Sequence, residues 1–233
     1  MSNATRPLVL LGGGGHARVL AALVRAAGHP VLGVCDPTLA ADGISRWADL
    51  DVLGDDGALE RLSPDRVALV LGIGQQATGN LRGQLYAAWR ARGYDFPALV
   101  HPSAWIAPGV ILGDGVQVMA GVVIQPGCAI GENSIVNTMA GVDHDCRIGR
   151  DVHVAPGATL CGTVTVEDGA FIGAGATVIQ GLRVGARAVV GAGVTLVQDL
   201  TPTAIIVGAA NRLRRQAIKK NDLGKNAKED AEQ

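Results

Sequence analysis

Three adjacent polar residues near the middle of the chain, Asp143, His144 and Asp145, are the strongest chemical signal in the sequence. They interrupt the run NTMAGVDHDCRIG (137–149), whose other residues are mostly small or aliphatic. An imidazole can accept a proton from a nucleophile near neutral pH, and a flanking carboxylate can fix its tautomer and stabilise the imidazolium that forms. The trio therefore predicts a general base with an acidic partner; the alternative is a solvated corner without chemistry.

The segment that carries this trio repeats with a period of six. Every sixth residue from Val100 to Leu196 is Val, Ile or Leu, and the fifth residue of each block is small or apolar. Such a period is typical of a hexapeptide β-helix, in which each block forms a short strand and a corner and three blocks form one coil of a prism. Successive coils stack as parallel strands about 4.8 Å apart. His144 is the third residue of its block, at a corner, so we expect its ring to point out of the prism.

Residues 6–99 follow a different pattern, in which strands alternate with helices. Apolar runs at 7–11, 30–37 and 66–74 predict three buried strands. The segments 16–28 and 80–93 have helical periodicity, and each ends at a glycine. This order predicts a small parallel sheet, that is, an α/β Rossmann-like βαβ domain.

A glycine-rich turn follows the first of these strands. Gly12 to Ala17 satisfies the pattern G-x-G-x-x-G/A, and Asp36 lies about twenty residues further on. Backbone N–H groups of this turn can bind a phosphate and Asp36 a ribose hydroxyl. A second turn, LGIGQQ (71–76), is expected at the same edge of the sheet. The expected nucleotide site comprises Gly12, Gly13, Gly14, Gly15, His16, Asp36, Pro37, Gly74 and Gln75.

This domain is too short for the two mononucleotide halves that a dinucleotide requires, so a mononucleotide fits better. A glycine-rich turn that serves only close packing is the alternative interpretation.

The composition restricts the class of partner. The formal net charge is −1 and no basic stripe runs through the repeat, so a nucleic acid is not expected as a partner. No stretch of about 18 uncharged apolar residues occurs, and the first residues lack the features of a signal peptide. The four cysteines have no zinc spacing. We therefore expect a cytoplasmic protein with reduced thiols that acts on a small molecule.

Both parts together resemble the nucleotide-sugar N-acetyltransferases of bacterial glycan pathways, the bacillosamine-type hexapeptide-repeat enzymes, which have sialic-acid O-acetyltransferases as relatives. The resemblance covers residues 7 to about 215. It implies a left-handed parallel β-helix, acetyl-CoA as co-substrate, no metal, and a homotrimer with active sites between subunits. The expected domains are a nucleotide-sugar-binding domain (1–99), an acetyl-CoA-binding β-helix (100–201) and a C-terminal extension (202–233).

The resemblance also implies roles for individual residues. The family run N-x5-[DE]-H-[DE] matches Asn137 and the trio, which makes His144 the general base, Asp145 its first-choice partner and Asp143 the second. Gly162 corresponds to the glycine whose amide faces the thioester carbonyl. The remaining matches are His16 and Asn137 near the sugar, and His153, Ala174 and Gly191 near acetyl-CoA. One departure is Gly208-Ala209-Ala210-Asn211, which lacks the proline of the family's G-x-P-A.

The expected reaction is direct attack on acetyl-CoA by the amino group of a nucleotide-linked 4-amino-4,6-dideoxy hexose. O-acetylation of a sugar or sialic acid and a non-catalytic scaffold are the alternatives. Two other sites are disfavoured. The spacing of His101, His144 and His153 does not match a zinc site, and no nearby residue argues for an activated Cys161 thiol. The basic segment 212–220 could either bind the phosphates of CoA or form a solvated helix.

Overall fold

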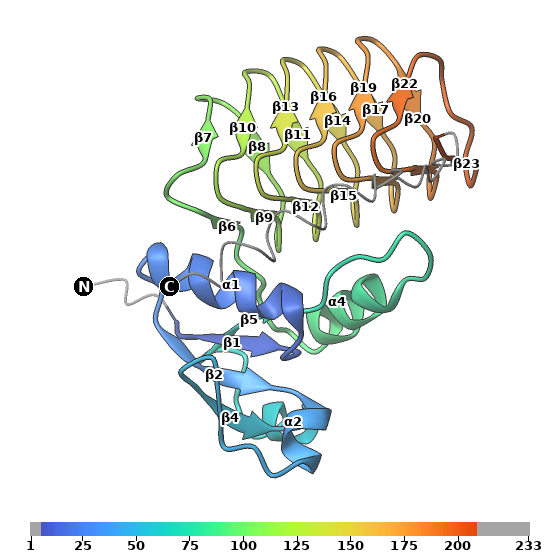
Figure 1. The fold of residues 1–233 in the computed structure, drawn as a ribbon. Helices are drawn as coiled ribbons and strands as arrows, with labels where there is room; N and C mark the ends of the chain where they lie inside the picture. The colour runs from blue at the N-terminus through green and yellow to red at the C-terminus, as the bar shows by residue number, and fades with distance from the viewer. Residues whose placement is uncertain (1–5, 209–233) are drawn as a thin grey trace, which may run out of the picture.

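The computed structural model describes residues 6–208, which form an α/β domain and a three-sided prism (Figure 1). The prism lies over one side of the α/β domain, and helix α1 (Gly15–Ala26) lies between the prism and the sheet. Residues 209–211 of the expected CoA exit and the basic segment 212–220 lie outside the described residues. None of the helices in the range 6–208 is long and apolar enough to cross a membrane.

The α/β domain is built on a five-stranded sheet of order β3-β4-β2-β1-β5. The three predicted strands are present as β1 (Leu8–Leu11), β2 (Val31–Cys35) and β5 (Ala68–Leu71), and all three are parallel. The prediction missed β4 (Leu50–Gly54) and the antiparallel edge strand β3 (Arg46–Trp47). No position of β4 is fully buried, so its sequence lacks the continuous apolar run that identified the other strands.

Helices cover both faces of this sheet. Side chains alternate along β1, so Leu8 and Leu10 pack with α1 while Val9 and Leu11 pack on the opposite side. That side is covered by the short helix α3 (Asp56–Leu59) and by α4 (Leu81–Ala91). A further short helix, α2 (Pro37–Ala41), follows β2. The predicted helices correspond to α1 and α4, whereas α2 and α3 are too short to show a helical period.

Three parallel sheets form the faces of the prism. The first face consists of β6 (Leu99–Val100), β9 (Gln117–Val118), β12 (Ile135–Val136), β15 (His153–Val154), β18 (Phe171–Ile172), β21 (Val189–Val190) and β23 (Ile205–Ile206). The second face consists of β7 (Trp105–Ile106), β10 (Val123–Ile124), β13 (Gly141–Val142), β16 (Thr159–Leu160), β19 (Thr177–Val178) and β22 (Thr195–Leu196). The third face consists of β8 (Ile111–Leu112), β11 (Ala129–Ile130), β14 (Arg147–Ile148), β17 (Thr165–Val166) and β20 (Arg183–Val184). This arrangement confirms the left-handed parallel β-helix.

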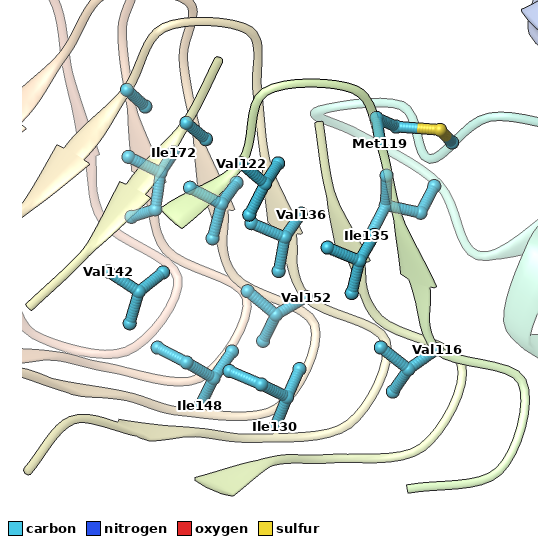
Figure 2. Close-up of a cluster of buried hydrophobic side chains, with 14 of the residues drawn as sticks. Val116, Met119, Val122, Ile130, Ile135, Val136, Val142, Ile148, Val152 and Ile172 are labelled. Carbon is cyan, nitrogen blue, oxygen red and sulfur yellow. The ribbon is translucent and has the colours of Figure 1, made fainter. Parts of the chain in front are cut away.

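The repeat determines which side chains fill the prism. Val136, Val142 and Ile148 belong to three different faces, and all three are buried in the interior (Figure 2). Each such aliphatic side chain contributes about 1.5–3 kcal/mol by leaving water. The register is eighteen residues per coil, as in the pairing of Ile124 with Val142. This eighteen-residue register continues as far as β22. The final strand, β23, pairs with β21 at a separation of only sixteen residues, so the last coil is shorter.

The corners follow the same period. Every sixth residue from Gly109 to Gly193, the fourth of each block, has a positive φ. Glycine adopts this conformation without strain, which explains its abundance in the repeat. Six of these positions nevertheless carry a side chain: Asn133, Met139, Asp145, Asp151, Thr163 and Arg187.

Candidate active site

His144 lies on the outside of the prism, at the corner between the second and third faces. The buried Val142 and Cys146 anchor the backbone on either side of it, while the imidazole is 57% exposed. His144 Nδ1 is 2.9 Å from Asp145 Oδ2, and Asp143 Oδ1 accepts a hydrogen bond from the backbone N–H of His144 at 2.7 Å. Asp145 therefore contacts the ring, and Asp143 orients the backbone.

These contacts determine the tautomer of His144. A carboxylate only accepts hydrogen bonds, so the neutral ring carries its proton on Nδ1 and leaves the lone pair on Nε2. The hydrogen bond to Asp145, followed by the charges of Asp143 and Asp145, raises the pKa of His144 above its ordinary value of 6.5. The ring is therefore a stronger base than a free histidine, and its basic nitrogen points away from the carboxylate.

Gly162 lies next to this nitrogen on the following coil. A Cβ at position 162 would be 2.5 Å from His144 Nε2, so the ring lies directly against the glycine α-carbon. Thr163 N donates to His144 O at 2.8 Å, which ties the two corners together. Within residues 6–208 the amide of Gly162 has no hydrogen-bond acceptor. A basic nitrogen therefore lies beside a glycine whose N–H group has no acceptor in this range.

The nucleotide site predicted from sequence forms a pocket of about 570 Å³ at the carboxyl edge of the α/β sheet. The predicted residues that line it are Gly12, Gly13, Gly14, Gly15, His16, Asp36, Pro37, Gly74 and Gln75. Asp56 from the start of α3, and Leu81, Leu85 and Trp89 from α4, line it as well, and sequence reasoning missed them. These residues line the pocket because α3 and α4 lie on the same side of the sheet, an arrangement that the sequence does not show.

Within this pocket, Asp36 shapes the glycine-rich turn. Asp36 Oδ2 accepts from Gly13 N at 2.8 Å, and Asp36 Oδ1 accepts from Leu39 N at 2.9 Å. The amide of Gly13 is thus already bound, contrary to the simple expectation that the whole turn faces a phosphate. The first N–H groups of α1, those of Gly15 and His16, have no partner inside the helix, and groups of this kind are suited to an anion at this end of the pocket.

His16 joins this pocket to the prism. Gln117 Nε2 donates to Leu71 O at 3.0 Å, so its Oε1 faces His16 Nε2 at 2.8 Å and accepts a hydrogen bond from the Nε2–H group. His16 Nδ1 is then an acceptor. Burial lowers the pKa of His16 to about 4, so the ring is neutral. Gln117 was not identified from the sequence. Its position on the first face of the repeat, where a polar side chain is unusual, could have indicated a contact with the α/β domain.

His153 occupies a second contact between the two parts of the chain. Its Nδ1 donates to Gln75 O at 3.2 Å, and its Nε2 accepts from Asn137 Nδ2 at 3.1 Å. The ring is buried, with its edge toward Phe171, and burial lowers its pKa to about 4. Both nitrogens of His153 are thus occupied, and its ring links the Gln75 loop to Asn137.

Arg82, at the start of α4, is a further buried residue that sequence reasoning missed. Its Nη1 donates to Leu71 O and Ile73 O, and its Nε donates to Asn133 O on the prism. Burial lowers the pKa of this guanidinium to about 9. Arg82 therefore ties the strand and loop that border the nucleotide pocket to the β-helix.

The predicted catalytic and ligand-binding residues of the prism are divided between two of its edges. His144 and Gly162 lie where the second face meets the third, whereas Asn137, Ala174 and Gly191 lie where the first face meets the second. The first face is the one that contacts the α/β domain through His16 and His153. Within one chain, the edge that carries His144 is therefore opposite the face that borders the nucleotide pocket.

The remaining candidates are His101, which lies away from this site, and Cys161, which lies beside it. His101 is on the first coil, where its Nδ1 is 2.8 Å from Ser103 Oγ. Across residues 6–208, no group of three or more metal-ligating side chains is clustered. Cys161 is a half-buried free thiol at the same corner as Gly162.

Three family models match the chain. The PglD N-terminal domain matches residues 7–83, the bacterial transferase hexapeptide (six repeats) matches 109–144, and the hexapeptide repeat of succinyl-transferase matches 163–198. No curated protein matches the chain.

Solved structures match over nearly the whole chain. A histidine variant of perosamine N-acetyltransferase from Caulobacter crescentus, in complex with CoA and GDP-perosamine, is 38% identical over 90% of this chain and 97% of that one, with a TM-score of 0.80. The acetyltransferase domain of PglB from Neisseria gonorrhoeae, in complex with acetyl coenzyme A, is 33% identical over 88% and 97%, with a TM-score of 0.81. WeeI from Acinetobacter baumannii is 27% identical over 88% and 97%, with a TM-score of 0.77.

Proposed function

Because the chain belongs to the nucleotide-sugar N-acetyltransferases of the hexapeptide-repeat superfamily, we propose that it transfers acetyl from acetyl-CoA to the amino group of a nucleotide-linked amino sugar. The observation that carries this proposal is the arrangement at His144. Its Nδ1 is bound to Asp145, and its Nε2 lies against Gly162, whose amide is open within the described residues. Acyl transfer to an amine requires a base and an oxyanion donor in this relation.

In the proposed mechanism, the sugar amine attacks the thioester carbonyl directly. His144 Nε2 accepts the proton that the amine loses, and Asp145 stabilises the resulting imidazolium. Gly162 N–H donates to the oxyanion of the tetrahedral intermediate. When the C–S bond breaks, the imidazolium returns its proton to the leaving CoA sulfur, so the enzyme ends the cycle unchanged. Neither a metal nor an acyl-enzyme is needed.

We propose that the active protein is a homotrimer with each site between two chains. This is supported by the separation of the predicted residues on two edges of the prism, because one ligand cannot touch both edges of the same chain. It is also supported by the exposed apolar side chains of Trp105, Val123 and Met139 at and beside the second face. The acceptor sugar would then reach from the pocket of one chain to His144 of its neighbour.

The proposed acceptor is a 4-amino-4,6-dideoxy hexose on a nucleoside diphosphate, in line with the GDP-perosamine bound by the relative from Caulobacter. We place the reaction in the cytoplasm, because acetyl-CoA is available there and the cysteines at 35, 128, 146 and 161 are free thiols.

A thiol-release assay tests the activity. Acetyl-CoA is offered with GDP-, UDP- and dTDP-linked 4-amino sugars and with matched sugars that carry only hydroxyl groups. Thiol release that requires the amino group supports the proposal. Release with the hydroxyl sugars alone would favour O-acetylation, and no release with any sugar would contradict acetyl transfer.

A subunit-mixing experiment tests the shared site. His144→Ala removes the base, and Gly14→Leu places a bulky side chain in the nucleotide pocket, at a position where a Cβ meets no protein atom within 4 Å. Co-expressing the two inactive chains should restore activity, because some interfaces then combine an intact pocket with an intact base. Mixtures as inactive as either chain alone would indicate that the site lies within one subunit.

A further inference from the structure

Gly127 lies directly beneath Asp145 on the preceding coil, and we infer that it is a positioning residue that holds the Asp145 carboxylate against the His144 ring. The two residues are eighteen positions apart and occupy the same corner, between the second and third faces. The inference rests on the proposed function, because it concerns how that site keeps its base in position.

The contact is between a carboxylate and a bare α-carbon. Asp145 N donates to Pro126 O at 3.0 Å, which stacks one corner on the other. A Cβ on Gly127 would collide with Asp145 Oδ1 and would lie 3.2 Å from its Cγ. One carboxylate oxygen thus lies over Gly127 while the other is bound to His144 Nδ1. Moving the first oxygen rotates the second away from the ring.

The backbone alone does not require glycine at this position. Gly127 has φ +79°, and the same left-handed position of other blocks is occupied by Asn133, Met139, Thr163 and Arg187. The fold therefore tolerates a side chain at this position of the corner. What distinguishes position 127 is the carboxylate above it, so the space left by the missing side chain serves the His144–Asp145 pair.

Gly127 and Gly162 enclose this pair from opposite sides. Gly162, on the following coil, leaves room for the imidazole, and Gly127, on the preceding coil, leaves room for the carboxylate. The guanidinium of Arg147 donates to Gly127 O at 2.6 Å, which fixes the peptide below the carboxylate. The two glycines therefore position a pair whose side chains are otherwise exposed to solvent.

Among the described residues, 6–208, few other charges act on the ring. Asp143 and Asp145 are on its own corner, the preceding corner contributes no titratable group at Pro126 or Gly127, and the following corner contributes only the Cys161 thiol. Arg147 is the nearest cation along the chain. The titration of His144 therefore reports mainly its contact with Asp145.

The test compares two glycine-to-alanine variants that differ in one respect. Gly127→Ala and Gly109→Ala both place alanine at the same left-handed corner position, at φ +79° and +83°. A Cβ at Gly127 meets the Asp145 carboxylate, whereas a Cβ at Gly109 meets nothing within 4 Å. The backbone strain is therefore matched, and only the contact with Asp145 differs.

The first readout is the titration of the His144 ring by NMR in the full-length protein. We expect Gly127→Ala to lower the His144 pKa toward 6.5, because the hydrogen bond that raises it is lost. Gly109→Ala should leave the titration unchanged. This readout does not depend on catalysis, so an inactive wild-type protein would contradict the proposed function without affecting this test. Equal titrations in Gly127→Ala and wild type would overturn the inference.

The second readout is kinetic and uses a double variant. Gly127→Ala should lower kcat at least about tenfold with the KM for acetyl-CoA nearly unchanged, as expected when a catalytic orientation is lost. In an Asp145→Ala background the same substitution should cost no more than Gly109→Ala does, because the carboxylate it displaces is absent. If the single variant does not fold, the double variant still tests the contact: recovered folding supports it, and continued failure to fold contradicts it.

Discussion

The imidazole of His144 lies against the α-carbon of Gly162, so close that a Cβ at position 162 would be 2.5 Å from Nε2 and 2.6 Å from Cε1. The two residues belong to successive coils, and the same corner of the prism carries both. The stacking of coils alone therefore places the proposed base next to the glycine that is the proposed oxyanion donor.

Gly162→Ala should therefore displace the base while leaving the prism intact. Gly162 does not have a positive φ, so alanine adds no backbone strain, and the exposed ring can rotate away from the methyl group. We expect a loss in kcat/KM of at least about a hundredfold, the usual contribution of a positioned base, with little change in the melting temperature. Gly141→Ala, where a Cβ meets nothing within 4 Å, is the control. Activity close to wild type in Gly162→Ala would argue against His144 as the base.

Asp145→Asn should change the pH dependence of the reaction. The hydrogen bond from His144 to Asp145 is the main reason that the His144 pKa lies above 6.5. A general base acts when neutral, so the acid limb of kcat/KM should have its midpoint above pH 6.5 in the wild type and shift to lower pH in the variant. Asp143→Asn should shift it less, because Asp143 does not contact the ring. Rate profiles between pH 5 and 9 check this, and identical midpoints in wild type and Asp145→Asn would contradict it.

His16 and His153 should make the folded protein less stable in acid. Burial lowers both pKa values from 6.5 to about 4, so between these pH values the unfolded chain binds protons that the folded chain does not. Stability from these two residues is then complete above pH 6.5 and falls toward pH 4, by up to about 1.4 kcal/mol per pH unit for each histidine. Urea denaturation at pH 7.5, 6 and 5 measures the slope. His153→Gln should flatten it, and an unchanged slope would show that His153 is not buried neutral in solution.

Arg82→Lys should be nearly as damaging as Arg82→Met. The guanidinium binds three carbonyl groups, of Leu71, Ile73 and Asn133, from two nitrogens at once, and a single ammonium group cannot reproduce this planar arrangement. We expect either variant to lose about 2–4 kcal/mol of unfolding free energy. The KM for the nucleotide sugar should also rise, because Ile73 borders the pocket. A lysine variant as stable as wild type would indicate that only the positive charge matters.

Much of the β-helix could be predicted from the order of residues alone. A strict period of six places Val142 and Cys146 inside the prism, and this requires the intervening His144 to be outside at a corner. The prediction held as far as Leu196 because the repeat contains no insertion up to that point; the shortened last coil has no equally regular signal. In the α/β domain, the strands with continuous apolar runs were found, whereas β4 was missed because it is only partly buried.

The details of the site depended on contacts that no local pattern encodes. From the sequence, either Asp143 or Asp145 could have contacted the His144 ring; in the structure Asp145 binds the ring, and Asp143 binds the backbone N–H. The packing of the α/β domain buries His153 under the carbonyl of Gln75, 78 residues away, a contact that the sequence did not indicate.

What the sequence determined by itself is which side of each strand and which corner a residue occupies, because side-chain direction follows the local period. What only the tertiary structure decided is which of these residues meet. His16 and Gln117 are 101 residues apart, and His144 and Gly162 belong to different coils. Contacts of this kind depend on stacking between coils and docking between the two parts of the chain, neither of which is a property of a short stretch of sequence.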